Sequence, residues 1–167
     1  MQPSFSIGDK SVYPAHGVAD VVDVENKEIG GSAITFYHLK VIGSGLKIIV
    51  PVHKAEENGM RSMATADEIE EMYELLRDHE IPNDRQTWNR RYRGFMEKIR
   101  TGSLFEVAEV FRDLSLLRTR KVLSHGERQM LRTARDLLVR ELVEAQKAPE
   151  EEVGAALEAP FGPPFEG

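Results

Sequence analysis

The residues with the clearest chemical potential lie in one short stretch, residues 87–100. This stretch holds Trp88, the only tryptophan in the chain, followed closely by Arg90, Arg91 and Arg93. Guanidinium groups bind phosphate oxygens through paired hydrogen bonds, and an indole can insert into a groove or meet a base. The combination predicts a contact with nucleic acid. The alternative is that Trp88 is the last core residue of a helix whose other faces are solvated.

Helical spacing divides the same stretch into two faces. At about 100° per residue, the apolar side chains of Tyr92, Phe95, Met96 and Ile99 lie on one side of a helix. Trp88 stands one turn before Tyr92, at the edge of this apolar stripe. We therefore expect Tyr92, Phe95 and Ile99 to anchor the helix in a core. Trp88 is expected to lie at the rim of that core, beside the arginines.

The formal net charge of −6 conceals three segments of different sign. Residues 1–84 carry 7 Lys and Arg against 15 Asp and Glu, residues 85–135 carry 13 against 5, and residues 136–167 carry 2 against 8. The middle of the chain is thus a basic block between acidic flanks, which is typical of a surface that binds a polyanion. An Arg-rich helical surface can also be a solvated face, so charge alone leaves both interpretations open.

The composition favours a small protein of the reducing cytoplasm. A chain of 167 residues allows one ordinary domain or two small ones, and it contains no cysteine that could form a disulfide. No apolar run is as long as a membrane span, and no basic segment leads into an apolar one at the N-terminus. We expect a soluble cytoplasmic protein without a membrane contact.

Apolar periodicity predicts a β domain followed by a helical one. Residues 5–52 contain short runs rich in Val and Ile, separated by glycine-containing turns. So few strands must curl, which predicts a small antiparallel barrel of Tudor-like or SH3-like type over residues 1–65. From residue 66 to residue 147 the apolar spacing is helical. The predicted fold class is therefore α+β in two domains, a barrel and then an all-α domain.

Capping signals locate the helices of the second domain. A hydroxyl followed three residues later by glutamate forms a capping box, and such pairs begin at Thr65, Ser103 and Ser124. Together with the stretch around Trp88, they predict four main helices. Residues 148–167 contain three consecutive glutamates and several prolines and glycines, which predicts a disordered acidic tail.

The sequence offers little for an enzyme. No pair of histidines has the spacing of a metal site, and there is no GxGxxG or complete phosphate-binding loop. The histidines are His16, His38, His53, His79 and His125. Clustered carboxylates around Glu70 lie largely on the polar face of a helix. We therefore expect no catalytic residue, no metal site and no cofactor.

Several segments resemble the CarD/CdnL family of bacterial transcription regulators. Residues 5–18, FSIGDKSVYPAHGV, are similar to the hGDxVVYPxHG start of that family. Further matching segments are WNRRY at residues 88–92, VAEVFRDL at residues 107–114 and LSHGER at residues 123–128. The resemblance covers residues 5 to about 146. It is strongest to the short CdnL type, which lacks an AT-hook extension.

The resemblance implies two partners. A Tudor-like N-terminal domain of this family docks on the β subunit of bacterial RNA polymerase, here through Lys27, Ile49, Val50 and Pro51. Ile49 stands where some relatives carry arginine, so this interface is expected to be less charged. The helical domain is expected to contact promoter DNA at the upstream edge of the melted bubble. The DNA-contacting residues implied are Trp88 as a wedge in the minor groove, Arg90, Arg91 and Arg93 on phosphates, and Asn89 and Met96.

The implied mechanism agrees with the charge distribution. An acidic chain binds free DNA poorly, but docking on polymerase raises the local concentration of the basic block to about millimolar. The prediction is a monomeric factor that stabilises the promoter open complex without reading sequence, and that reaches the nucleoid through polymerase. The alternative is a protein-interaction adaptor whose basic helical face binds an acidic protein.

Overall fold

A computed structural model describes residues 4–79 and 88–166, apart from the side chains of residues 88 and 89. The chain divides into two compact units, Met1–Met63 and Ala64–Gly167, and each is described by itself. The division lies close to residue 65, where the period of the sequence changes. The α+β class, with strands first and helices after them, is confirmed.

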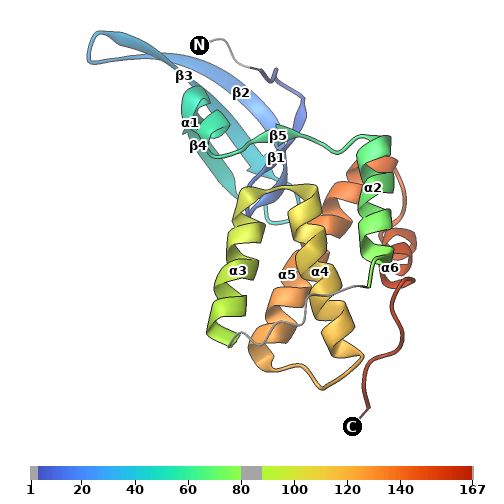
Figure 1. The fold of residues 1–167 in the computed structure, drawn as a ribbon. Coiled ribbons are helices and arrows are strands. Elements are labelled where there is room, and N and C mark those ends of the chain that lie inside the picture. Colours follow the sequence, from blue (N-terminus) through green and yellow to red (C-terminus); the bar gives the residue numbers. More distant parts are fainter. Residues whose placement is uncertain (1–3, 80–87, 167) are drawn as a thin grey trace. The chain divides into compact units, whose positions relative to one another are not determined.

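The first unit is built on one antiparallel sheet (Figure 1). Its strands, in the spatial order β4-β3-β2-β1-β5, are β1 (Lys10–Tyr13), β2 (Gly17–Ile29), β3 (Ser32–Val41), β4 (Lys47–Pro51) and β5 (Arg61–Ser62). The short helix α1 (Val52–Glu57) follows β4. No ladder joins β4 to β5 among the described residues, so the predicted barrel is an open, curled sheet.

The long β2–β3 hairpin forms because its turn can take positive φ. Gly30 and Gly31 have φ of 61° and 82°, as the tight turns that match strand twist require. Alternation along the strands then places Val21, Tyr37 and Leu39 in the core of this unit, each 1% exposed. The Tyr37 hydroxyl accepts hydrogen bonds from the backbone of Ser4 and Phe5, at 2.9 and 3.2 Å. The N-terminal segment is thereby fastened to the sheet.

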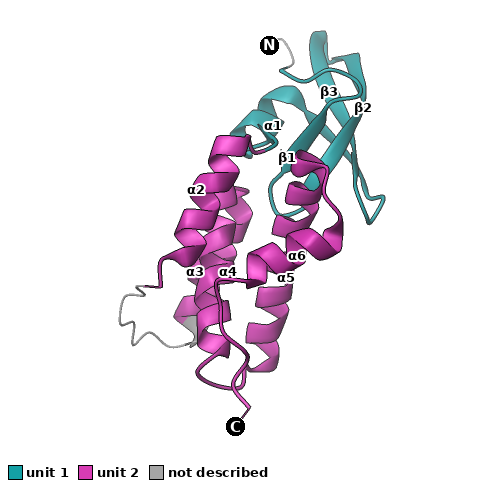
Figure 2. Ribbon diagram, turned by 90° about the vertical axis from the view of Figure 1, so that its right-hand side faces the viewer, with its two compact units in different colours: residues 1–63 teal, residues 64–167 magenta. Residues whose placement is uncertain are grey.

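In the second unit, all the regular elements of the described residues are helices (Figure 2). Its helices are α2 (Ala66–Arg77), α3 (Trp88–Thr101), α4 (Leu104–Arg118), α5 (His125–Gln146) and α6 (Glu150–Glu158). The capping boxes predicted at Thr65 and Ser124 are both formed. At Ser103 the hydroxyl accepts from the Glu106 amide, which is the first half of the box. Local sequence therefore fixes where α2, α4 and α5 begin.

Helix α4 is the centre of the helical core. It contacts α2, α3 and α5, and it buries side chains around much of its circumference. Ala108, Val110 and Leu114 are fully buried, and Phe111 is 2% exposed. A helix that is apolar on most sides must be covered by neighbours. Helices α2, α3 and α5 provide this cover.

The prediction of a disordered tail is wrong for residues 150–158, which form α6. Val153 and Leu157 lie one turn apart on this helix and are 2% and 0% exposed in the core of the unit. Glu158 pairs with Arg135 of α5 at 3.0 Å. The three glutamates that suggested disorder occupy the first helical turn, where negative charge stabilises a helix. This fifth helix was absent from the predicted four.

The chain beyond α6 also packs against the helical unit. The Phe161 ring stacks on His79, with centroids 5.6 Å apart, and meets the edge of Phe111 at 5.8 Å. The Phe165 amide donates to the Arg118 carbonyl at 2.9 Å. The composition of this segment does not predict these contacts, because its apolar residues are few and widely spaced.

The α6 contact gives a stability prediction. Replacing buried Leu157 by alanine should lower the free energy of unfolding by about 2–4 kcal/mol, because it removes apolar burial and leaves a cavity. Urea unfolding followed by circular dichroism measures the change. The matched control is Ala155→Ser, an exposed position on the same helix, which should change stability by less than about 0.5 kcal/mol. Equal stability of both variants would mean that α6 is not packed.

Candidate functional site

The arginines of α3 differ in exposure. Arg90 and Arg93 are exposed, whereas Arg91 is half-buried. The Arg91 Nε atom is buried, and it has no hydrogen-bond partner within the described part of the chain. The side chains of Trp88 and Asn89 lie outside the described residues. Of the predicted phosphate contacts, Arg90 and Arg93 are therefore the most available to a ligand.

The apolar stripe of α3 narrows toward the start of the helix. Ile99 is 2% exposed, and Phe95 and Met96 pack partly buried against the core of the unit. Tyr92 is 43% exposed, so the prediction that it anchors the helix is wrong. The C-terminal half of α3 is embedded in the core, whereas Arg90, Tyr92 and Arg93 in its N-terminal half are exposed. Met96, assigned to DNA from the family resemblance, lies on the packing side.

One ion pair fastens α3 to α4. Lys98 Nζ lies 2.8 Å from Glu109 Oε2, and both side chains are about one-third exposed. Nearby, Arg112 Nε is 3.0 Å from Asp113 Oδ1. Burial raises the pKa of Asp113 above its ordinary value, although the hydrogen bond from Arg112 and the charges of Arg112 and Lys98 lower it in part. Charges as well as apolar contacts thus set the position of α3.

The turn between α4 and α5 adds cations at the same end of the helical unit. Helices α3 and α4 run antiparallel, so the start of α3, the end of α4 and the start of α5 lie together (Figures 1 and 2). Arg120, Lys121 and Arg128 of this region are exposed. Val122, between them, is 64% exposed. We call the exposed cations Arg90, Arg93, Arg120, Lys121 and Arg128 the cationic end.

The α4–α5 turn was not among the residues predicted from sequence. The basic block of residues 85–135 includes this turn and was the available signal in the sequence. A count of charges does not say, however, which cations share a face.

A buried carboxylate organises the α4–α5 turn. Glu127 is 3% exposed, and its Oε1 accepts from the Ser124 amide at 2.8 Å and lies 2.9 Å from Lys121 Nζ.

The pKa of Glu127 reflects these partners. Burial raises it, but the hydrogen bonds from Ser124 and Lys121 and the charge of Lys121 outweigh burial, so the pKa is lowered overall. The folded state therefore favours the charged carboxylate. Its contribution to stability is complete above the ordinary value of 4.5 and is lost as pH falls through the lower folded pKa.

The β unit presents a different surface. Ile49 is 60% exposed on β4, which is an edge strand of the sheet, and Pro51 is half-buried on the same face. Val50 points to the opposite face and is 7% exposed, so only its backbone is open to a partner. Lys27 on β2 is exposed, with Nζ 5.9 Å from the centre of the Phe36 ring.

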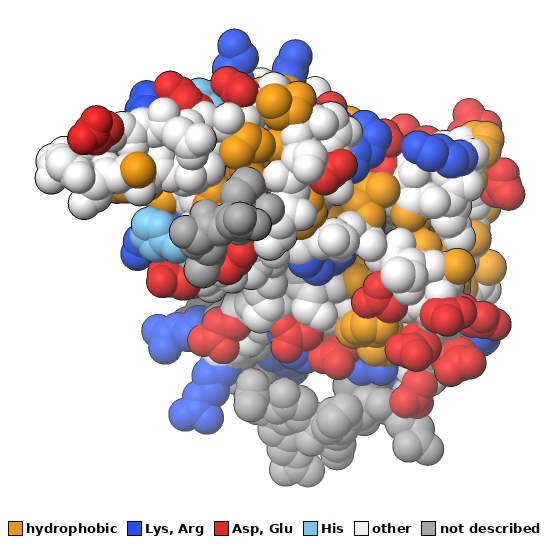
Figure 3. Space-filling view, turned by 90° about the horizontal axis from the view of Figure 1, so that it is seen from above, with side chains coloured by type: hydrophobic (Ala, Val, Ile, Leu, Met, Phe, Trp, Pro, Cys, Tyr) orange, Lys and Arg blue, Asp and Glu red, His pale blue; other side chains and the backbone are white. Residues whose placement is uncertain are grey.

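On the face shown in Figure 3, some hydrophobic side chains are exposed at the surface among charged ones. Within the β unit, the large apolar residues that are about half exposed or more are Ile7, Val22, Ile29, Leu46 and Ile49. Ile49 is the one among them that lies on an edge strand with free backbone groups on its outer side, so far as the structure describes the chain.

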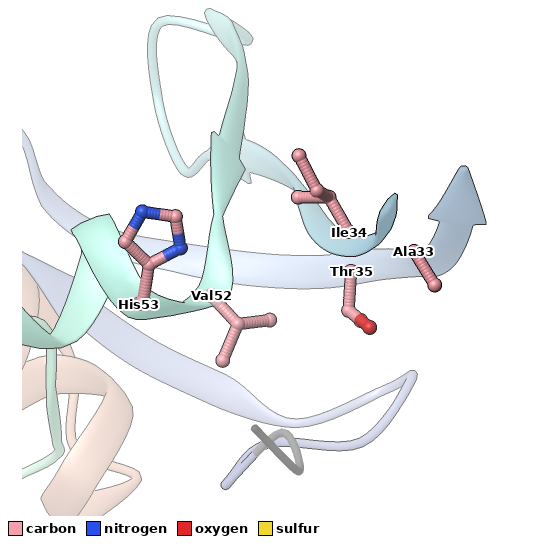
Figure 4. Close-up of a pocket in the computed structure, with 5 residues that line it drawn as sticks. All are labelled: Ala33, Ile34, Thr35, Val52 and His53. Carbon is pink, nitrogen blue, oxygen red and sulfur yellow. The ribbon is translucent and has the colours of Figure 1, made fainter. Parts of the chain in front are cut away.

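A hollow in the β unit lies between β3 and α1 (Figure 4). Its lining residues are Ala33, Ile34, Thr35, Val52 and His53. The only polar side chains in this lining are the Thr35 hydroxyl and the His53 imidazole, too few to orient a cofactor. In the described ranges, 4–79 and 88–166, no helix has the length and apolarity needed to cross a membrane.

Comparisons with known proteins agree with this two-unit organisation. The family model described as CarD, C-terminal domain matches residues 71–158, and the model described as CarD-like/TRCF RID domain matches residues 5–64. The chain is 31% identical over 139 residues to "Putative transcription factor YdeB" of Bacillus subtilis (strain 168), covering 83% of this chain and 90% of that protein. It is also similar to the solved structure of CdnLNt from Myxococcus xanthus, with 40% identity, a TM-score of 0.31, and coverage of 37% of this chain and 87% of that one.

The Glu127 contacts predict a specific dependence of stability on pH. Glu127→Gln keeps an acceptor for the Ser124 amide but removes the charge, so it should cost about 1 kcal/mol at pH 7. Once pH falls below the lowered pKa of the folded state, the wild-type side chain is protonated too, and the difference should vanish. Urea unfolding at pH 7 and at an acid pH below that folded pKa tests this. Glu106→Gln, at the equivalent position of α4, is the control and should have little effect. An equal loss for Glu127→Gln at both pH values would contradict the charged contact.

Proposed function

The chain belongs to the CarD family of transcription regulators that interact with RNA polymerase, and from this premise we propose that it docks on the polymerase β subunit and stabilises the promoter open complex. The β unit is the docking module, and the helical unit contacts DNA at the upstream edge of the melted region. Members of this family are regulators rather than enzymes. The chain accordingly acts by binding one intermediate of transcription initiation.

The cationic end of the helical unit is the observation that carries the DNA contact. Five exposed cations from α3, the α4–α5 turn and α5 gather there, although the chain as a whole has a net charge of −6. Cations contributed by more than one helix can hold phosphates at several points along a backbone. Because such contacts read no base, the proposed binding is independent of sequence.

Trp88 has a particular position in this arrangement. It is the first residue of α3, in the half of the helix where Arg90, Tyr92 and Arg93 are exposed. An apolar side chain inserted between base pairs costs a few kcal/mol in a closed duplex, whereas at the edge of a melted bubble part of that unstacking has already occurred. We assign Trp88 the wedge, with Arg90 and Arg93 on the adjacent phosphates.

The edge strand β4 supports the docking role of the β unit. An exposed edge offers unpaired backbone groups to which a partner strand can add, and neighbouring side chains give specificity. Ile49 and Pro51 supply an apolar contact on one face of β4, and Val50 contributes backbone. Lys27 lies on the same sheet and offers a positive charge. This surface is suited to a strand with apolar and acidic side chains.

Docking also explains how an acidic protein binds DNA. Residues 1–84 and 136–167 carry net negative charge and repel a polyanion in free solution. Once the β unit is bound to polymerase, the cationic end is held near the promoter at an effective concentration of about millimolar. Weak contacts with phosphates are then sufficient.

The wedge is tested by the lifetime of the open complex. Trp88→Ala should shorten this lifetime by about tenfold or more, because the base pairs that the indole holds apart are then free to stack again. Binding to polymerase should be unchanged. The measurement is dissociation of a heparin-challenged complex. Tyr92→Leu replaces an aromatic side chain of α3 that is 43% exposed, and it serves as the control, with a near-normal lifetime. An unchanged lifetime for Trp88→Ala would rule out the wedge.

The docking edge is tested separately. Ile49→Glu should weaken binding to the isolated β subunit by about tenfold or more, because it buries a charge in an apolar contact. Ile29→Glu alters a comparably exposed isoleucine at the end of β2 and should bind normally. Binding of the full chain is measured by fluorescence anisotropy. If both variants bind equally well, β4 is not the docking edge, whatever the DNA contacts do.

A further inference from the structure

Three side chains of types that can bind a metal ion lie close together on the exposed face of the β2–β3 hairpin. Asp23 and Glu25 are two residues apart on β2, and so they point to the same face of the sheet. His38 of β3 is the ladder partner of Asp23. One ligand atom from each of the three lies within 4.8 Å of the other two. The pairing register of the hairpin therefore assembles an imidazole and two carboxylates.

The immediate contacts orient Glu25 toward the histidine. His38 Nε2 lies 2.7 Å from Glu25 Oε2, and Lys27 Nζ lies 3.8 Å from Glu25 Oε1. The His38 side chain is 25% exposed and that of Glu25 is 36% exposed, so the group is partly shielded but open to solvent. One carboxylate oxygen thus faces Lys27, and the other faces the imidazole.

We propose that Asp23, Glu25 and His38 bind a divalent transition-metal ion such as zinc. One imidazole nitrogen and two carboxylate oxygens are common zinc ligands, and they leave a coordination position for water or a fourth donor. Imidazole selects against magnesium and calcium, which need more oxygen ligands than this site has. Among the divalent metals, zinc binds such a donor set more tightly than manganese.

The site needs only a small rearrangement to hold an ion. Ligand atoms at about 2.0–2.2 Å from one ion are separated by roughly 3–4 Å. The 2.7 Å pair of His38 and Glu25 is closer than this, so the ion replaces their hydrogen bond as the two side chains rotate apart. Because the three ligands come from two strands, a bound ion cross-links β2 and β3. Zinc should accordingly stabilise the folded β unit.

The test uses the full chain after treatment with chelator. Isothermal titration with zinc chloride should give one saturable site at submillimolar metal, with binding at least tenfold tighter than for magnesium chloride. His38→Gln can still hydrogen-bond to Glu25 but is a poor ligand, and it should weaken zinc binding at least tenfold. Asp23→Asn should have a similar effect, and circular dichroism verifies that each variant is folded. The control is His53→Ala, an exposed histidine of the same unit, which should bind as wild type.

Two results would overturn the proposal. One is the absence of saturable binding at submillimolar zinc, in which case the group is simply a hydrogen-bonded histidine and glutamate. The other is one-site binding that His38→Gln and Asp23→Asn leave unchanged, because the metal would then lie elsewhere. Cobalt(II) gives an independent readout, since its visible absorption reports coordination directly and should be lost in the His38→Gln variant.

Discussion

The helical unit depends on the burial of α4. Because this helix is apolar on most sides, α2, α3 and α5 must pack around it, and the short connection at Gly102 and Ser103 makes α3 and α4 antiparallel. That packing brings the start of α3 to the same end as the α4–α5 turn. The cationic end is therefore a consequence of covering an apolar helix. The Lys98–Glu109 ion pair helps to hold α3 on α4, and the first two turns of α3 carry the exposed side chains of Arg90, Tyr92 and Arg93.

The surfaces of the two units suit two different proposed roles. The sheet has an open edge at β4 with an exposed isoleucine, which suits attachment to a protein strand. The helical unit gathers cations, which suits contact with phosphates. Neither surface needs high affinity, because each binding event raises the effective concentration of the other. This coupling would reconcile the negative net charge of the chain with the proposed contact to DNA.

Local signals in the sequence predicted where helices begin better than they predicted which residues the tertiary structure buries. The boxes at Thr65 and Ser124 marked two helix starts because capping is a property of adjacent residues. Tyr92 shows the limit: helical spacing placed it on the apolar face, but the core ends before it reaches that turn. The C-terminal segment shows a second limit. Val153 and Leu157 are buried by helices that lie far away in the sequence, and composition does not reveal such contacts. Likewise, the charge count located the basic block, but only antiparallel packing joins its two cationic segments, and only strand register brings His38 to Asp23.

The central claim is that the start of α3 meets promoter DNA when the β unit is docked on polymerase. A photocrosslinking amino acid placed at position 88 of the full chain tests it directly in an assembled promoter complex. The account predicts crosslinks to DNA at the upstream edge of the melted region when polymerase is present, and few or none when it is omitted. Crosslinks to a protein partner alone, with polymerase and open promoter present, would contradict the account and favour an adaptor.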